Sequence, residues 1–528
     1  ATVFPDQSPL FTYKDLDKTC ECFARVSPKD AETYRGFVRM SQQVLQMFMP
    51  GLYAPPPPLG ELVAMLDRSD EGRLMLDYMN RDCLDLVERL YESDKVKIHL
   101  LRLVSENLQC PNELGTGMGV LLMPGIIHTY GVSQPIGGSG KLTEALVRCL
   151  QHHGGELRCN AEVAQVLVSG GRASGVRLAS GETIAAKDAV IGAIHPHVVR
   201  KFVQGVPEPV LQRAERATLA PFSIMVSHYD LKEPCRYHAG EEVGYATMLE
   251  FMATDRLDEM IADFDDIRRG LITVRRLCAG GDESIGDRTR VPSGAGMFHG
   301  ITFAPYQVKD ARWSGRHWDD IKEEIGDLSL AHYRRFVSNL TDDNIVARTI
   351  VSPVDLERSS PNSMMRGDLH GVAPYLYQSA GHRPTPDLGQ YTVPGVERLY
   401  LAGPFQHPGG GVYGAGRATA IKMFEALGMD FGAVAAGVRH DGGVPATMAA
   451  ASAPAPTAGL VLRGAADEEL MRVEALERVG DELVIKGKSF GTMPLQARLD
   501  AAGARAGLKL LGWKKLAFLA TLPFRTGK

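Results

Sequence analysis

Apolar residues in roughly the first 130 positions recur with the spacing of amphipathic helices. One such stripe consists of Tyr34, Phe37, Val44 and Phe48. Its start is marked by Ser27 as a capping residue, by Pro28 in the first helical position and by Asp30 in a capping-box pattern. The pair Pro50-Gly51 predicts its end. Further helices are predicted at 60–67, 82–92 and 94–106.

From Pro135 onward the pattern changes to helices alternating with strands. The segment Gly137-Gly138-Ser139-Gly140 leads into an amphipathic stretch, Lys141–His152, and Gly154-Gly155 predicts its end. Short strands are predicted at Glu156–Cys159, Val163–Val168, Gly175–Leu178, Thr183–Ala185 and Ala189–Ile194. Further on, strands are predicted at Phe222–Tyr229, Phe298–Ala304 and Ile345–Val351. A helix is predicted between the last two, at Trp318–Asn339. This alternation predicts an antiparallel sheet covered by helices.

The composition shifts after Met429. Residues 444–459 form an Ala/Pro/Ser/Thr tract that cannot pack a core, which predicts a linker before a small C-terminal module at 460–528. The last piece, Leu508–Lys528, carries five cations and no acid on an apolar helical pattern. Such a helix suits a membrane surface, because cationic side chains meet anionic head groups while the apolar face enters the interface. A helix packed on its own domain is the alternative, and both interpretations stay open.

Length and charge narrow the class of protein. At about 150 residues per domain, 528 residues predict two to four domains. A net charge of -5 argues against nucleic-acid binding, since such proteins usually carry a basic face. The eight cysteines are scattered and predict reduced thiols in a cytoplasmic protein. No metal site is predicted, because the sequence contains no HxxxH, HExxH or Cys/His cluster at ligand spacing. A serine hydrolase is not indicated either, since no GxSxG elbow occurs on a strand-to-helix turn.

The candidate chemistry lies near residue 400. The apolar run Leu399–Ala402 predicts a strand, the glycine-rich stretch from Gly403 to Gly416 predicts a loop, and Arg417–Leu427 predicts a helix. A strand that feeds a glycine-rich loop at a helix start offers bare amides and the positive end of the helix dipole to an anionic or electron-rich ligand. For a flavin, the matching part is the pyrimidine side of the ring, which gains negative charge on reduction.

The segment HPGGGVYGAGRA, which begins at His407, resembles the C-terminal flavin motif of the phytoene desaturase family. Pro135–Gly155, together with the later segment NAEVAQVLVSGGRASGVRLASGE, resembles that family's central block, in which the residue at the place of Val163 contacts the adenine side through its backbone. The opening, TYKDLDKTCECFARVSPKDAETYRGFV, resembles flavin-type carotene ketolases and the phytoene dehydrogenase-like proteins of bacteria and mitochondria. The resemblance covers residues 1 to about 430 and implies FAD as the cofactor.

The resemblance also implies which residues meet the cofactor and the substrate. The cofactor residues are Val163, Gly403, Pro404, His407, Pro408, Gly409, Gly410, Gly411, Val412, Gly414 and Gly416. The substrate-side candidates are His370, Tyr375, Tyr377, His382, Arg383 and Tyr413, and none is assigned as a catalytic base. The implied reaction moves a hydride from a carbon of a hydrophobic substrate, polyene or isoprenoid, to flavin N5. An amine, alcohol or steroid-like substrate on the same fold is an alternative.

One part of the family pattern is missing. The family begins with a strand, GxGxxG and a helix within a βαβ unit, and no such fingerprint lies near residue 1. We therefore expect either a truncated gene product or a partner chain that completes the FAD site. An auxiliary or inactive flavoprotein-like subunit is a further alternative.

The fold prediction is mixed α/β. It comprises an N-terminally incomplete Rossmann-like FAD domain, a substrate domain of antiparallel sheet plus helices, and the small C-terminal module. The predicted divisions are 1–134 (helical part of the substrate domain), 135–220 (middle FAD block), 221–390 (substrate domain), 391–430 (C-terminal flavin block), 444–459 and 460–528.

Overall fold

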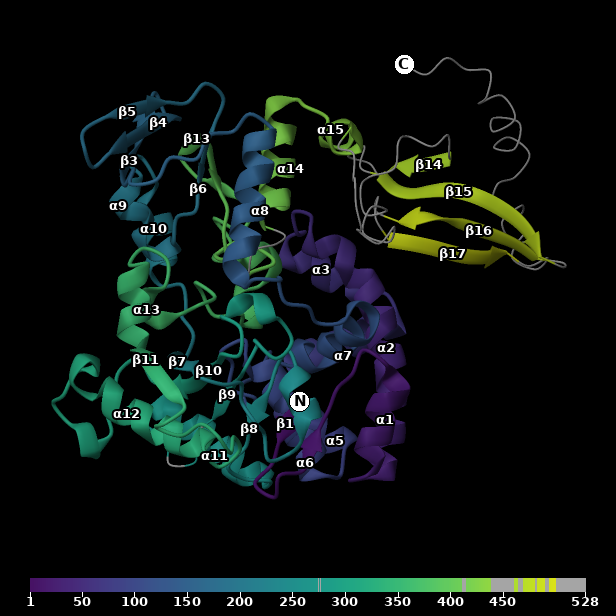
Figure 1. The fold of residues 1–528 in the computed structure, drawn as a ribbon. Coiled ribbons are helices and arrows are strands. Elements are labelled where there is room, and N and C mark those ends of the chain that lie inside the picture. Colours follow the sequence, from purple (N-terminus) through teal and green to yellow (C-terminus); the bar gives the residue numbers. More distant parts are fainter. Residues whose placement is uncertain are drawn as a thin grey trace, which may run out of the picture. The chain divides into compact units, whose positions relative to one another are not determined.

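The computed structural model describes two units, residues 1–428 and 429–528, each considered by itself (Figure 1). The described residues are 1–273, 275, 277–410, 415–437, 460–463, 469–479, 482–489 and 493–499. The predicted linker at 444–459 and the tail Leu508–Lys528 lie outside them, so a membrane-surface contact of the tail stays a prediction. None of the described helices combines the length and the apolar character that crossing a bilayer requires.

The N-terminal region is helical, as its apolar spacing predicts. Its helices are α1 (Leu16–Ala24), α2 (Pro28–Leu52), α3 (Leu59–Leu66), α4 (Asp70–Asn80), α5 (Cys83–Leu90), α6 (Asp94–Ser105) and α7 (Met118–Tyr130). Ser27 caps α2 as predicted, since its hydroxyl accepts from the main-chain N–H of Asp30 at 3.1 Å. The predicted end at Pro50-Gly51 is wrong, because α2 continues to Leu52. Pro50 lacks the N–H that would donate to the carbonyl four residues earlier, and the helix ends two residues after it.

A seven-stranded sheet forms the centre of the first unit, in the order β11-β7-β10-β9-β8-β1-β2. Its strands are β1 (Thr2–Val3), β2 (Pro9–Leu10), β7 (Ser223–Leu231), β8 (Glu250–Phe251), β9 (Cys278–Gly281), β10 (Gly296–Ala304) and β11 (Ile345–Val351). All neighbouring pairs are antiparallel except β1 with β8. The helices α11 (Leu257–Arg269), α12 (Trp318–Tyr333) and α13 (Pro353–Ser359) come from the same region. The predicted helix Trp318–Asn339 thus ends early, at Tyr333.

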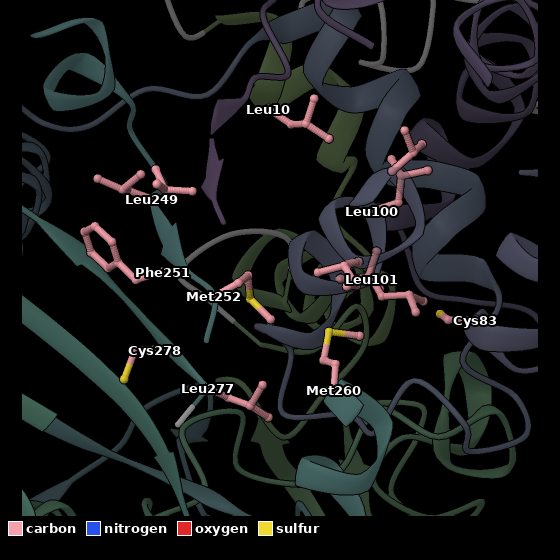
Figure 2. Close-up of a cluster of buried hydrophobic side chains, with 14 of the residues drawn as sticks. Leu10, Cys83, Leu100, Leu101, Leu249, Phe251, Met252, Met260, Leu277 and Cys278 are labelled. Carbon is pink, nitrogen blue, oxygen red and sulfur yellow. The ribbon is translucent and has the colours of Figure 1, made fainter. Parts of the chain in front are cut away.

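The main core lies between this sheet and the N-terminal helices (Figure 2). Leu101 of α6, Phe251 of β8 and Met260 of α11 are all fully buried in it. Burial of such side chains is the main favourable term in folding. Helix α6 is therefore fixed against the sheet, and its end at Ser105 brings the next residue, Glu106, to the wall of a cavity described below.

A second sheet of six strands has the order β12-β13-β4-β3, with β5 on β4 and β6 on β13. Its strands are β3 (Val163–Ser169), β4 (Arg172–Leu178), β5 (Thr183–Ala185), β6 (Val190–Gly192), β12 (Thr392–Val393) and β13 (Val396–Leu401). Helices α8 (Ser139–His152), α9 (Val199–Phe202) and α10 (Glu208–Glu215) belong to this region. The predicted strand Glu156–Cys159 is wrong: these residues are irregular and exposed, because a strand needs a pairing partner.

The second unit contains α15 (Phe431–Gly437) and an antiparallel sheet in the order β14-β15-β16-β17. The strands are β14 (Leu460–Arg463), β15 (Glu469–Val479), β16 (Glu482–Ser489) and β17 (Met493–Leu499). All eight cysteines of the chain lie in the first unit and are free thiols, as the sequence predicts.

Candidate functional site

The predicted glycine-rich motif follows a buried parallel strand and precedes a helix. Leu401, at the end of β13, pairs with Gly192 of β6, and the N–H of Ala402 donates to the Gly192 oxygen at 3.0 Å. Helix α14 (Ala415–Leu427) follows the loop. The hydroxyl of Thr419 donates to the Leu401 oxygen at 2.8 Å, which ties the helix to the strand end. The amino end of α14, which favours anionic groups, is thus anchored beside the loop.

Three glycines of the loop adopt backbone angles that favour glycine. The φ values are +100° at Gly403, +90° at Gly409 and +32° at Gly410. A Cβ atom at Gly409 would lie 2.4 Å from Nε of Arg383, and one at Gly410 would lie 2.3 Å from Nδ1 of His370. The loop therefore packs directly on these two side chains. Four predicted motif residues, Gly411, Val412, Tyr413 and Gly414, lie outside the described residues.

Arg383, predicted on the substrate side, supports the loop from within the protein. Its side chain is 2% exposed. Nη2 donates to the main-chain oxygens of Pro404 at 2.9 Å, Val372 at 3.0 Å and His370 at 3.1 Å. Burial lowers the pKa of Arg383 to about 10, against the opposing charge of Asp368. The guanidinium is fully committed to carbonyl oxygens, so it holds the segment before the motif and the motif together.

His370 links the loop to the end of α6. Its ring donates to the main chain of Glu106, and burial lowers its pKa, so the imidazole is neutral at pH 7. Its position against Gly410 places Glu106 one side chain away from the motif.

The other predicted substrate-side residues are spread along the same segment. The hydroxyl of Tyr375 donates to Oε2 of Glu113 at 2.9 Å, and that of Tyr377 donates to Oγ1 of Thr218 at 3.0 Å. The two tyrosine rings are stacked, with 5.5 Å between their centroids. His382 is half-buried in the turn before Arg383. These contacts are made within the protein, and the candidates do not converge on one point.

The motif also contacts the end of α2. Nε2 of His407 lies 2.9 Å from the Gly51 oxygen, and Arg417 donates to the Tyr53 oxygen at 2.5 Å. Burial lowers the pKa of His407. The N-terminal helical region therefore borders the site. Of the other predicted cofactor residues, Pro404 accepts from Arg383 as described, and Gly416 lies in the first turn of α14 with open space at its α-carbon.

Gln406 is a residue of the motif that sequence reasoning missed. It is 0% exposed, and neither Oε1 nor Nε2 has a hydrogen-bond partner among the described residues. Buried polar side chains almost always have partners, so an orphaned amide points to a polar ligand group. The orphaned amide, the glycine backbone and the helix amino end together fit the polar ring of a flavin. In the sequence, this glutamine between Phe405 and His407 has no distinctive spacing that would have marked it as a ligand-binding residue.

A cavity of about 380 Å³ has Glu106 in its wall. Strands β8, β9 and β10 supply the sheet side of the wall. The buried Arg102 donates from Nε to Oε2 of Glu250 at 2.9 Å and from Nη2 to Oε1 of Glu106 at 2.9 Å. Burial raises the pKa of Glu106, and the charge of Glu250 raises it further. Sequence reasoning missed this network because residues 102 and 250 are 148 positions apart.

The second sheet is open on the side of β6. Within the described residues, β6 pairs only with β13, and Ile191 in its middle is 52% exposed. None of α8's side chains is buried against the described part of the chain. Leu142, Leu146 and Leu150, spaced four residues apart on one face, are 38%, 54% and 45% exposed. A parallel sheet is normally covered on both faces, so this edge lacks a covering strand and helix.

The fit to a complete FAD differs between its two ends. Val163, predicted beside the adenine, begins β3 and is 36% exposed. In the described residues, no third parallel strand with a glycine turn lies beside β6 to receive a pyrophosphate. In the part of the chain that the structure describes, the ring end thus has a cradle, whereas the dinucleotide end does not. Among the same residues, no group of three or more His, Cys, Asp or Glu side chains is placed to hold a metal ion.

Comparison with known proteins gives distant matches along most of the chain, although no protein-family model matches it. A lycopene-forming phytoene desaturase of Pseudescherichia vulneris is 24% identical over 412 residues, 76% of this chain and 77% of the relative. One of the subunits of limonene dehydrogenase from Castellaniella defragrans is 21% identical over 447 residues, 80% of this chain and 79% of the relative. Pyridine nucleotide-disulfide oxidoreductase domain-containing protein 2 of Mus musculus is 26% identical over 361 residues, 65% of this chain but 60% of the relative.

Proposed function

Because this chain is a phytoene desaturase-like flavoprotein, an FAD-dependent oxidoreductase, we propose that it takes a hydride from a carbon of a largely apolar substrate. Bound FAD supplies the hydride acceptor. The chain's own residues orient the two reactants and exclude water. The matched desaturases are named for polyenes, which makes an isoprenoid one candidate substrate. An amine, alcohol or steroid-like molecule is the other.

The observation that carries this proposal is the glycine cradle between His370 and α14. Gly409 and Gly410 let the backbone approach a flat ring, and the buried amide of Gln406 offers one donor and one acceptor. His370 contacts the main chain of Glu106, and Glu106 lines the cavity. The proposed place of the substrate is this cavity. No residue is assigned as a catalytic base.

Flavin retention tests this proposal. In Gly410→Val the new side chain must displace His370, and the strained backbone must shift, so we expect flavin binding to weaken at least about tenfold. The measure is quenching of flavin fluorescence on titration into the purified full chain. Gly36→Ala is the control, since Gly36 has open space and lies within α2. Equal flavin affinity of Gly410→Val and the unsubstituted chain would contradict the cradle.

We further propose that a strand–glycine loop–helix unit completes the FAD site along β6 and α8. The open parallel edge can receive a strand through main-chain hydrogen bonds, and the leucines of α8 can receive an apolar helix face. The matched limonene dehydrogenase chain is itself named as one part of an enzyme with several chains. In this role the present chain binds the flavin ring. A further segment or a partner chain binds the dinucleotide part of FAD.

The reactivity of Cys149 tests this second proposal. Cys149 is exposed on α8, whereas Cys235 is buried. We expect a maleimide to label Cys149 of the chain alone rapidly, and to label it at least about tenfold more slowly once a dinucleotide-binding unit encoded beside the gene is co-expressed. Cys235 serves as the internal control for unfolding. Unchanged labelling of Cys149 in a complex that binds FAD would place the unit elsewhere.

A further inference from the structure

The wall of the cavity that Glu106 lines contains carboxylate oxygens that receive no hydrogen bond. Glu250 is 4% exposed; its Oε2 accepts from Arg102, but its Oε1 has no partner among the described residues. Oε2 of Glu283 is also buried without a partner, while Oε1 lies 3.4 Å from Nδ1 of His299. Two carboxylate oxygens on one cavity wall therefore lack hydrogen-bond donors.

The other acids of the wall already have donors. Asp282 accepts from the N–H of Cys235 at 2.8 Å. Asp287 accepts from the N–H of Gly137 at 2.7 Å and from Nε of Arg290 at 3.1 Å. The positive charge of Arg290 is thus committed to Asp287. These groups shape the wall, whereas Glu250 and Glu283 each keep one oxygen without a donor.

The cation that contacts Glu250 is shared between two acids. Arg102 contacts both Glu250 and Glu106, so one guanidinium faces two carboxylates. Burial and the charge of Glu250 raise the pKa of Glu106 to about 8, so Glu106 is protonated at pH 7 and Arg102 balances the charge of Glu250. The negative charge without a cationic side chain of Arg or Lys beside it is that of Glu283, whose contact is the ring of His299. A buried carboxylate without a full set of donors is costly, and a ligand that brings a positive charge and N–H donors relieves that cost.

Aromatic and aliphatic side chains complete the wall. The rings of Tyr237 and Tyr245 and the side chains of Ile136, Leu249 and Ile301 all line the cavity. Aromatic faces attract cations, and aliphatic groups favour an apolar ligand body. The volume of about 380 Å³ lies within the usual range for small-molecule sites.

We propose that this cavity binds the ammonium group of a primary or secondary amine with an apolar body, held by Glu250 and Glu283. The inference rests on the proposed function, since it makes this amine the substrate presented to the flavin site. It favours an amine over an all-hydrocarbon polyene, which has no donor for either carboxylate.

Binding of two matched probes tests the proposal on the full chain without added FAD. Isothermal titration with hexylamine and with 1-hexanol compares a cation with a neutral molecule of the same length. We expect hexylamine to bind at least about tenfold more tightly. Glu250→Gln and Glu283→Gln each lower hexylamine affinity about tenfold and leave that of 1-hexanol unchanged. Glu241→Gln, an exposed acid outside the cavity wall, is the control and keeps the original affinity.

Glu283→Gln decides the matter if Glu250→Gln does not fold, because Glu283 lies outside the Arg102 network. Equal affinity of the two probes, or unchanged hexylamine affinity in the folded glutamine variants, overturns the proposal. These outcomes are separate from those of the flavin experiments. A chain that binds hexylamine but no flavin would retain the amine site and lose the proposed reaction, and the reverse result would retain the reaction and lose the substrate class.

Discussion

The two sides of the second sheet differ in how far they are covered by other parts of the described chain. On the side of β13, the strand end, the glycine loop and α14 are joined by buried hydrogen bonds, including those of Thr419 and Arg383. On the side of β6, Ile191 and the leucines of α8 face solvent. The contrast teaches that, within the described residues, the loop that fits the flavin ring is tied into the fold, whereas the β6 edge and α8 are left exposed.

On the β13 side, removing the guanidinium of Arg383 is expected to lower the free energy of unfolding the most. Arg383→Met leaves buried carbonyl oxygens of Val372 and Pro404 without their donor, which costs about 3–5 kcal/mol of unfolding free energy. Urea unfolding measures the loss. Arg216→Met, at an exposed position, is the control and should change stability by less than about 0.5 kcal/mol. A loss of similar size in both variants would contradict the supporting role of Arg383.

Paired leucine truncations compare the two sides directly. Leu399 of β13 is 1% exposed, so Leu399→Ala should cost about 2–5 kcal/mol. Leu146 of α8 is 54% exposed, so Leu146→Ala should cost less than about 0.5 kcal/mol in the chain alone, because alanine also favours a helix. Urea midpoints of the two variants give the comparison. A cost for Leu146→Ala near that of Leu399→Ala would show that α8 is already covered.

A smaller effect is expected where α14 meets the strand end. Thr419→Val removes the hydrogen bond to the Leu401 oxygen while keeping the side-chain shape. The expected loss is about 1 kcal/mol, the usual net value of one buried hydrogen bond. Thermal melting would detect it, with Thr183→Val in the exposed strand β5 as the control. No loss in Thr419→Val would mean that other contacts fix the helix.

Local patterns were enough to predict the β13–loop–α14 unit, because a strand, a glycine run and a helix follow one another within about 30 residues. Features that depend on distant pairing were not predicted. Glu156–Cys159 has the composition of a strand but has no partner strand beside it. The contact of Arg102 with Glu250 joins α6 to β8, and no periodicity reports it. The exposed edge along β6 and α8 was likewise not predicted, because exposure depends on how the strands pair in space.

The affinity ratio of FAD to riboflavin tests most directly whether the chain alone holds the ring and lacks the dinucleotide cradle. Titration of each flavin into the full chain, followed by fluorescence quenching, gives both dissociation constants. If the described site is the whole of what the chain offers, FAD and riboflavin bind with affinities within about threefold of each other, a difference under about 1 kcal/mol. An FAD affinity at least about a hundredfold above that of riboflavin would contradict this, because it would require a pyrophosphate cradle within the chain.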